Sequence, residues 1–188
     1  MGLEQVIVVV SGDPGSGKST VARRLKAALG PEYEFFSGGD FRGEIARRHN
    51  MTIDELNEIG KREIWPHKEC DDLVVEYGKP KSKMVIDSWL AWHFIPHATK
   101  IYLRVDPDVG AQRVFANQRP DEPHKKTVEE VKEMLQTRYR VTNESYIKWY
   151  GADMTRMSNY DLVIDTTRKD KDAAFQDVLD FVKKKRNL

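Results

Sequence analysis

Short runs of β-branched and aromatic residues alternate along the chain with longer segments whose apolar positions recur every three to four residues. Such short runs are typical of buried strands, and the longer segments are typical of amphipathic helices. Strands that alternate with helices predict a five-stranded parallel sheet with helices on both faces, which is an α/β fold. The predicted strands are Gln5–Val10, Tyr33–Phe36, Lys83–Asp87, Ala98–Val105 and Tyr160–Asp165.

Capping residues indicate where the helices begin. Asp40 is a suitable N-cap for a helix that runs to about His49, and Thr52 opens a second helix with a capping box. We expect this second helix to reach Tyr77 and to be kinked at Pro66. Asp106 and Thr127 are the N-caps of two later helices, and a last helix begins at about Asp170.

The first predicted strand leads into a stretch that matches the phosphate-binding P-loop, G-x-x-x-x-G-K-[ST]. A strand before the loop and an amphipathic helix after it form the context in which this motif binds phosphate. The backbone N–H groups of the loop point at phosphate oxygens, and the positive end of the helix attracts the same charge. We expect the nucleotide phosphates to lie against Gly12, Asp13, Pro14, Gly15, Ser16, Gly17, Lys18, Ser19 and Thr20.

Three side chains near this loop have the chemistry to bind ATP and Mg²⁺. Lys18 can reach the β- and γ-phosphates, and the Ser19 hydroxyl can ligate Mg²⁺. Asp87 ends the third predicted strand, and the carboxyl ends of parallel strands meet at one edge of the sheet. Its carboxylate can therefore hold a water of the Mg²⁺ shell. The alternative is a strand-end aspartate that caps the following turn.

Composition and charge restrict the class of protein. The chain has 188 residues, of which 39% are hydrophobic and 32% charged, as expected for one globular domain. A net charge of +1 provides no field that would draw the protein to nucleic acid or to an anionic membrane. One cysteine excludes an internal disulfide, and no apolar run approaches the ~18 residues of a membrane span. We therefore expect a cytoplasmic monomer that binds neither nucleic acid nor a membrane.

A proline-rich polar segment at about residues 117–127 is predicted to be a mobile lid. Arg119 lies within it and Arg138 follows it, and guanidinium groups on a closing lid can meet the charge of a phosphoryl group during its transfer. A closed lid also excludes water. Arg113 and Arg140 lie near the same segment, with a solvated surface position as the alternative for each.

Asp40 and Arg42 open the helix that follows the second strand, opposite the P-loop at the end of the sheet. A second, phosphate-bearing substrate would lie beside them. The alternatives are an ordinary N-cap for Asp40 and a solvated helix position for Arg42.

These residues together resemble the cytidylate kinase branch of the nucleoside monophosphate kinases, in particular its short archaeal-type members. The resemblance implies a single P-loop kinase domain over residues 1–188, with an acceptor-binding helical segment at about 38–80 and the lid at about 117–127. It also implies ATP with Mg²⁺ as the donor and a nucleoside monophosphate, CMP or dCMP, as the acceptor. The blocks that carry it are residues 11–22, 37–42, 85–87 and 159–166, with Arg113, Arg119, Arg138, Tyr146 and Tyr150.

The chain departs from this family pattern at Gly43, Trp89 and Ser145, where the family commonly has arginines. In the family the first two help to hold the acceptor, and the third stabilises the phosphoryl group in transfer. Each charge-assisted hydrogen bond is worth ~1.5–3 kcal/mol, so their loss is substantial. Three functions therefore stay open: a kinase of CMP or dCMP, a kinase of another nucleotide or a small metabolite, and a weakly catalytic nucleotide-binding switch.

Overall fold

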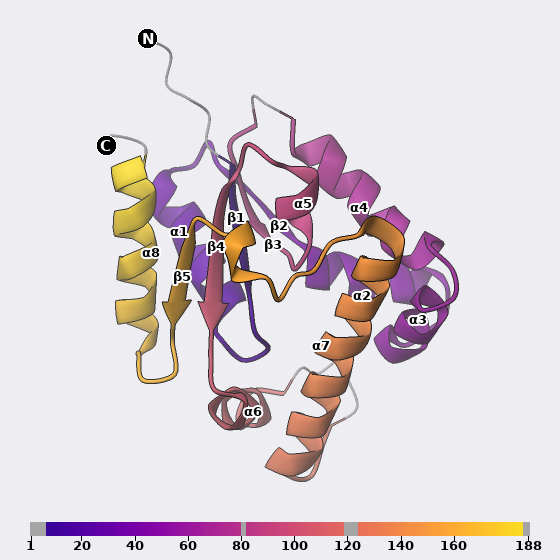
Figure 1. The fold of residues 1–188 in the computed structure, drawn as a ribbon. Coiled ribbons are helices and arrows are strands. Elements are labelled where there is room, and N and C mark those ends of the chain that lie inside the picture. Colours follow the sequence, from indigo (N-terminus) through magenta and orange to yellow (C-terminus); the bar gives the residue numbers. More distant parts are fainter. Residues whose placement is uncertain (1–6, 80–81, 119–123, 186–188) are drawn as a thin grey trace.

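A five-stranded sheet in which every pair of neighbours is parallel forms the centre of the molecule, in the order β2-β3-β1-β4-β5 (Figure 1). The structure is a computed structural model and describes residues 7–79, 82–118 and 124–185. All five predicted strands are present, with bounds shifted by one or two residues, so the predicted P-loop α/β fold is confirmed. The strands are β1 (Ile7–Gly12), β2 (Glu34–Ser37), β3 (Met84–Asp87), β4 (Thr99–Arg104) and β5 (Leu162–Asp165).

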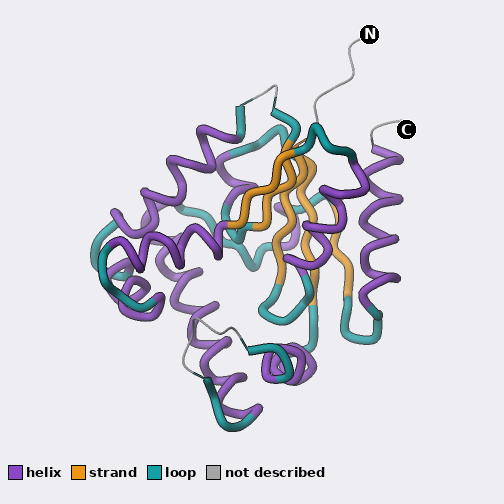
Figure 2. The backbone as a smooth tube through the Cα atoms, turned by 180° about the vertical axis from the view of Figure 1, so that it is seen from behind, coloured by secondary structure: helices purple, strands orange, loops and turns teal. Residues whose placement is uncertain are grey.

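The central strand β1 is buried along its whole length because helices cover both faces of the sheet (Figure 2). Its side chains alternate between the two faces, as the pleat of a strand requires. Val8 and Val10 belong to one apolar cluster, whereas Ile7 and Val9 belong to the other. A strand buried on both faces is apolar at successive positions, which explains the continuous run of β-branched residues.

The helices form one layer on each side of the sheet. Helices α1 (Lys18–Leu29) and α8 (Lys171–Lys185) share a core with Val8, Val85 and Ile101 on one face. On the other face, the core around Val9 and Ile86 includes residues of α2 (Gly38–Arg48), α3 (Ile53–Gly60), α4 (Trp65–Tyr77), α5 (Ala91–Phe94) and α7 (Val128–Tyr150). Helix α6 (Pro107–Phe115) packs against α7, and a short 3-10 turn, η1 (Met157–Asn159), precedes β5. Within the described ranges, no helix combines the length and apolar character of a membrane span.

Two of the predicted helix boundaries are wrong. Ser37, not Asp40, caps α2, because its hydroxyl accepts the N–H of Asp40 at 3.2 Å and the helix already begins at Gly38. The predicted kinked helix is two helices, since α3 ends at Gly60 and α4 begins at Trp65. Pro66 lies in the first turn of α4, where a missing N–H removes no helical hydrogen bond.

The other caps agree with the sequence pattern. The capping box between Thr52 and Glu55 is present, and the side chains of Asp106 and Thr127 cap α6 and α7. Gly151 ends α7 in the left-handed region, with a φ of 63°.

Helix α6 packs directly on the backbone of the P-loop through a pair of glycines. A Cβ atom at Gly15 would lie 2.3 Å from the carbonyl oxygen of Gly110, and one at Gly110 would lie 2.6 Å from that of Pro14. Gly15 also has a φ of +79°, which side-chain-bearing residues rarely adopt. The two glycines therefore allow the start of α6 to support the loop.

We predict that Gly110→Ala destabilises the protein by ~1–3 kcal/mol, because the added methyl group meets backbone that cannot move without displacing the P-loop. At a helix position with open space around it, the same change would stabilise the protein by up to ~1 kcal/mol. The sign of the change in stability therefore shows whether the methyl group meets the P-loop backbone. Urea unfolding measures the effect, with Gln112→Ala at an exposed position of the same helix as the control. A Gly110→Ala variant as stable as this control would contradict the close packing.

Candidate active site

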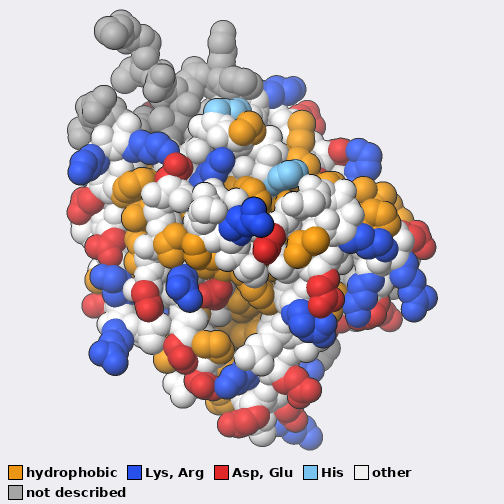
Figure 3. All heavy atoms as spheres, in the orientation of Figure 1, with side chains coloured by type: hydrophobic (Ala, Val, Ile, Leu, Met, Phe, Trp, Pro, Cys, Tyr) orange, Lys and Arg blue, Asp and Glu red, His pale blue; other side chains and the backbone are white. Residues whose placement is uncertain are grey.

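A pocket of about 1040 Å³ lies at the carboxyl ends of the strands, where open parallel sheets bind their ligands. The P-loop, the end of β3, the inner faces of α4 and α7 and the start of α8 all contribute to it. Figure 3 shows the molecule hollowed on the face above α6 and α7, with hydrophobic side chains inside and charged side chains around the rim. At this volume the pocket is larger than a site for one small ligand usually is.

Residues 14–20 of the P-loop line this pocket, as predicted for a phosphate site. The Ser16 hydroxyl is buried there and has no hydrogen-bond partner among the described residues. Such an unpaired polar group is costly unless a ligand satisfies it, and a phosphate oxygen would do so. Gly12 and Asp13 are not part of the lining, and Asp13 instead anchors the loop by accepting the N–H of Val105 at 3.0 Å.

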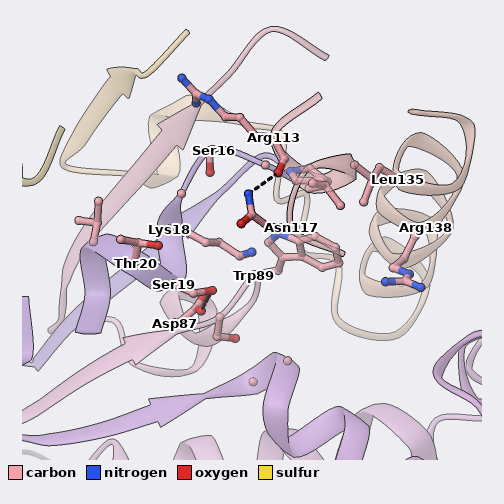
Figure 4. A pocket seen from close by; sticks show the side chains of 18 of the residues that line it. Ser16, Lys18, Ser19, Thr20, Asp87, Trp89, Arg113, Asn117, Leu135 and Arg138 are labelled. Atoms are coloured by element: carbon pink, nitrogen blue, oxygen red, sulfur yellow. Dashed lines mark hydrogen bonds between the residues drawn. The ribbon is translucent and has the colours of Figure 1, made fainter. Parts of the chain in front are cut away.

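The side chains predicted to serve ATP and Mg²⁺ converge on one place. The Ser19 hydroxyl donates a hydrogen bond to the carboxylate of Asp87, which is buried at the end of β3. Lys18 points along the pocket toward the ring of Trp89, with Nζ 5.5 Å from the ring centre (Figure 4). A hydroxyl and a carboxylate oxygen are ligands that Mg²⁺ prefers in combination with substrate phosphates. Among the described residues there is no cluster of three or more His, Cys, Asp or Glu that could hold a metal.

The predicted arginines differ in where they lie. Arg138 extends from α7 into the pocket, with 16% of its side chain exposed and its guanidinium 3.0 Å from an Asp54 oxygen (Figure 4). Arg113 also lines the pocket, and its guanidinium donates to backbone carbonyls near the start of α8, including that of Thr166 at 2.8 Å. Arg140 is exposed, pairs with the carboxylate of Glu144 and is not part of the lining. Arg119 lies outside the described residues.

Of the two residues predicted for the acceptor, only Arg42 lines the pocket. Its Nε donates to Asn57 Oδ1 at 2.8 Å and one terminal nitrogen donates to the carbonyl of Pro66 at 3.1 Å. The other terminal nitrogen is buried and has no partner among the described residues. Asp40 lies outside the pocket lining, with 53% of its side chain exposed and an ion pair to Arg23. Side chains two residues apart on a helix point in directions that differ by about 200°, so Asp40 and Arg42 face different ways.

The inner face of α4 contributes site residues that the sequence reading missed. His67, Cys70 and Asp71 are buried and line the pocket, and Asp71 accepts a hydrogen bond from the Tyr150 hydroxyl at 2.6 Å. The signal was available, because positions 67, 70, 71 and 74 have the spacing of a buried helix face. An aspartate on such a face indicates a function, since unpaired carboxylates are rarely buried.

Comparison with known proteins places this geometry in a family. The family model of the AAA domain matches residues 8–138. The chain is 34% identical to the cytidylate kinase of Halobacterium salinarum over 180 residues, which are 94% of this chain and 89% of that protein. It is 30% identical to the cytidylate kinase of Pyrobaculum neutrophilum, over 94% of this chain and 92% of the relative.

The chain belongs to the cytidylate kinase family. It is a nucleotide kinase-like P-loop phosphotransferase. A further relative, an S-adenosylmethionine-dependent nucleotide dehydratase of Lacinutrix mariniflava, is 32% identical over 85% of this chain but over only 32% of its own length. Among solved structures, a shikimate kinase of Acinetobacter baumannii in complex with shikimate has a TM-score of 0.60 at 18% identity, covering 97% of this chain and 96% of that one, which shows a shared fold.

Two of the positions at which this member differs from the cytidylate kinase pattern have clear structural roles. The indole N–H of Trp89 donates to the carbonyl of Gly12 at 2.8 Å, so the side chain is tied to the P-loop. Ser145 is buried, donates to the carbonyl of Val141 within α7 and does not line the pocket. Gly43 is also absent from the lining. Its neighbour Arg42 does line the pocket and brings a positive charge to it from α2.

Burial sets the protonation states of this cytidylate kinase-like pocket at neutral pH. It raises the pKa of Asp71 to about 6, although the hydrogen bond from Tyr150 and the charge of Arg42 oppose the shift. Burial, followed by the positive charge of Arg42, lowers the pKa of His67 to about 4. Burial also raises the pKa of the Cys70 thiol to about 12. At pH 7 the pocket thus holds a neutral histidine, a neutral thiol and a mainly ionised carboxylate near Arg42.

We predict that the contributions of His67 and Asp71 to the stability of the protein change in opposite directions as the pH falls from 7 to 5. A depressed histidine pKa means that the unfolded chain binds the extra proton, so the His67 contribution is lost as the pH falls. A raised aspartate pKa means that the folded chain binds it, so the Asp71 contribution grows as the pH falls. When the pH is lowered from 7 to 5, the free energy of unfolding of His67→Gln should rise by ~1–2 kcal/mol relative to that of the wild type. The free energy of unfolding of Asp71→Asn should fall by ~1 kcal/mol relative to that of the wild type.

Urea unfolding at pH 7, 6 and 5 measures these differences. Asp72→Asn serves as the control, because Asp72 is exposed and adjacent to Asp71 on the same helix. If the difference in unfolding free energy from the wild type changed with pH in the same direction for both variants, the result would contradict the burial of one of the two groups.

Proposed function

We propose that this protein transfers the γ-phosphoryl group of ATP to CMP or dCMP, giving ADP and the nucleoside diphosphate. The observation that carries the proposal is one pocket lined both by a phosphate-binding loop and by a half-buried arginine, Arg42, and a buried aspartate, Asp71. In this proposal the chain acts as one monomeric kinase domain. Residues 38–80 hold the acceptor and residues 117–127 form the lid.

At the donor end, the P-loop binds the triphosphate through its backbone N–H groups and Lys18. Ser19 and Asp87 would hold Mg²⁺, Ser19 directly and Asp87 through a water, because their oxygens already lie within hydrogen-bonding distance of each other. When bound, the ion neutralises charge on the β- and γ-phosphates. Lys18 adds a second positive charge to the same oxygens, which favours the departure of ADP.

The transfer itself requires orientation and charge stabilisation and does not require a strong base. An oxygen of the acceptor phosphate is already anionic, so it forms the new bond to the γ-phosphorus as the bond to the bridging oxygen of ADP breaks. Arg138 and Arg119 would contact the phosphoryl oxygens during this step. Arg138 enters the pocket from α7, on the side opposite the P-loop (Figure 4).

At the acceptor end, Arg42 and Asp71 match the hydrogen-bonding edge of cytosine. Cytosine presents an amino donor at N4 and acceptors at N3 and O2. The Asp71 carboxylate can accept from the amino group, and the unpaired nitrogen of Arg42 can donate to an acceptor. Uracil presents an oxygen where cytosine has the amino group, and this oxygen is repelled by an ionised carboxylate. This complementarity and the cytidylate kinase relatives both support a cytosine nucleotide.

We predict that ADP release is stimulated most by CMP and dCMP in a comparison with UMP, AMP, GMP and small alcohols. Asp71→Asn should raise KM for CMP about 10- to 100-fold, since it removes a charge-assisted hydrogen bond of ~1.5–3 kcal/mol. The preference over UMP should fall by a similar factor, because an amide can also donate to the uracil oxygen. Asp72→Asn on the outer side of α4 is the matched control and should leave both values unchanged.

An absence of stimulation by every pyrimidine monophosphate would contradict the cytosine acceptor and would favour a different nucleotide or metabolite. Unchanged discrimination in Asp71→Asn, with normal turnover of CMP, would instead contradict only the assigned role of this carboxylate. A thermal shift with each monophosphate separates binding from turnover, since a ligand of the native state raises its apparent stability.

We predict that Lys18→Met lowers kcat about 100- to 1000-fold, the range observed when one charge-stabilising donor is removed from an active site. The thermal shift caused by CMP alone should persist, because Arg42 and Asp71 are unaffected. Lys26→Met, in the last turn of the same helix, provides the control. Full turnover in Lys18→Met would show that the P-loop lysine does not serve the transferring group.

A further inference from the structure

A chain of hydrogen-bonded side chains, half-buried at its two ends and buried in the middle, connects α7 to the P-loop. It begins at Tyr139, the residue that follows Arg138 in α7. The hydroxyl of Tyr139 lies 2.6 Å from that of Tyr102 on β4, and the Tyr102 hydroxyl lies 2.5 Å from Asp13 Oδ1. The second oxygen of Asp13 accepts the N–H of Val105. Both oxygens of this loop residue are therefore fixed.

The direction of the hydrogen bonds follows from the Asp13 carboxylate, which can only accept. Tyr102 uses its one proton on Asp13, so Tyr139 must donate to Tyr102. Burial raises the pKa of Tyr139 to about 12 and that of Tyr102 above its ordinary value, and both tyrosines therefore keep their protons at neutral pH. The hydroxyl of Tyr139 thus completes a directed path from α7 to the start of the P-loop.

The ring of Tyr139 forms a second path to the same loop. It packs edge to face against Trp89, with ring centres 5.6 Å apart and an angle of 86° between the planes. Trp89 in turn donates its indole N–H to the carbonyl of Gly12 and lies with its ring beside the Lys18 ammonium. Figure 4 shows Trp89 between Lys18 and the helix that carries Arg138. One tyrosine thereby contacts both ends of the P-loop through neighbours.

We propose that Tyr139 is a positioning residue that couples α7 to the P-loop, so that Arg138 and Lys18 are held in register across the transferring phosphoryl group. Its catalytic part rests on the proposed function, in which these two cations act on opposite sides of the γ-phosphate. The coupling of α7 to the loop stands without that function, because it follows from the contacts alone. Trp89 also gains a role, since an indole cannot form the bidentate phosphate contact of an arginine but can link the loop to α7.

Hydrogen exchange tests the coupling without any substrate. Tyr139→Phe keeps the ring against Trp89 and removes only the donated proton. We expect the backbone amides of residues 12–18 to exchange about 3- to 10-fold faster, the factor for one neutral hydrogen bond, while those of α8 are unchanged. The matched control is Tyr146→Phe, because Tyr146 lies on the same helix and its ring packs against that of His67 on α4. Equal P-loop exchange in the two variants would overturn the coupling.

Kinetics then test whether the coupling serves the reaction. Tyr139→Phe should lower kcat about 3- to 10-fold with KM for ATP and CMP within twofold, because Tyr139 is not among the residues that line the pocket. In an Arg138→Met background the same change should have no further effect on kcat, since the group that it positions is gone. An equal loss in both backgrounds would overturn the positioning role. No turnover by the wild type with any monophosphate would count against the proposed function, and hydrogen exchange would still decide the coupling.

Discussion

The anchoring of the P-loop to β4 is the constraint on which the rest of the site depends. Asp13 donates its own N–H to the carbonyl of Leu103 and accepts two hydrogen bonds from β4 and the residue that follows it. A loop held in this way presents its N–H groups to phosphate without first having to be ordered, which lowers the free energy cost of binding. The glycine contact with α6 supports the opposite side of the loop. The loop therefore has contacts with β4 and α6 that do not depend on a bound nucleotide.

In the proposed function, the two ends of the pocket bind their substrates by different means. The donor end relies on backbone N–H groups and a lysine, which suit a triphosphate of any nucleoside. The acceptor end relies on side chains that are themselves held by hydrogen bonds: Arg42 by Asn57 and the carbonyl of Pro66, and Asp71 by Tyr150. Groups that are fixed in this way can discriminate between bases, because a wrong base leaves a buried polar atom unpaired. Selectivity in the proposed reaction thus comes from the acceptor end.

Two positions at which the resemblance to cytidylate kinases leads us to expect arginines have structural roles in this chain. Trp89 joins the P-loop to α7 through an indole N–H and an aromatic face, and Ser145 completes a hydrogen bond within its own helix. Arg42 on α2 places a positive charge in the pocket, and its guanidinium reaches across to α3 and α4. Trp89 and Ser145 therefore have structural roles in this chain, and the positive charge that α2 brings to the pocket is that of Arg42.

The sequence by itself determined the parallel sheet, the P-loop and the donor residues, because each depends on local features. Buried β-branched runs specify strands, and a loop between such a strand and a helix can hold only a narrow set of residues. The placement of Asp87 beside Ser19 was also predictable, since parallel strands end at the same edge of the sheet.

Only the tertiary structure decided which helix residues line the pocket. It separated Asp40 from Arg42, divided one predicted helix at residues 61–64 and brought Asp71 of α4 into the pocket with Arg42 of α2. It also connected Tyr139 to Asp13 over more than a hundred residues of sequence. The physical reason is that side-chain direction on a helix depends on how the helix packs. Local sequence fixes that a helix forms, whereas the partners of its faces come from segments distant in the chain.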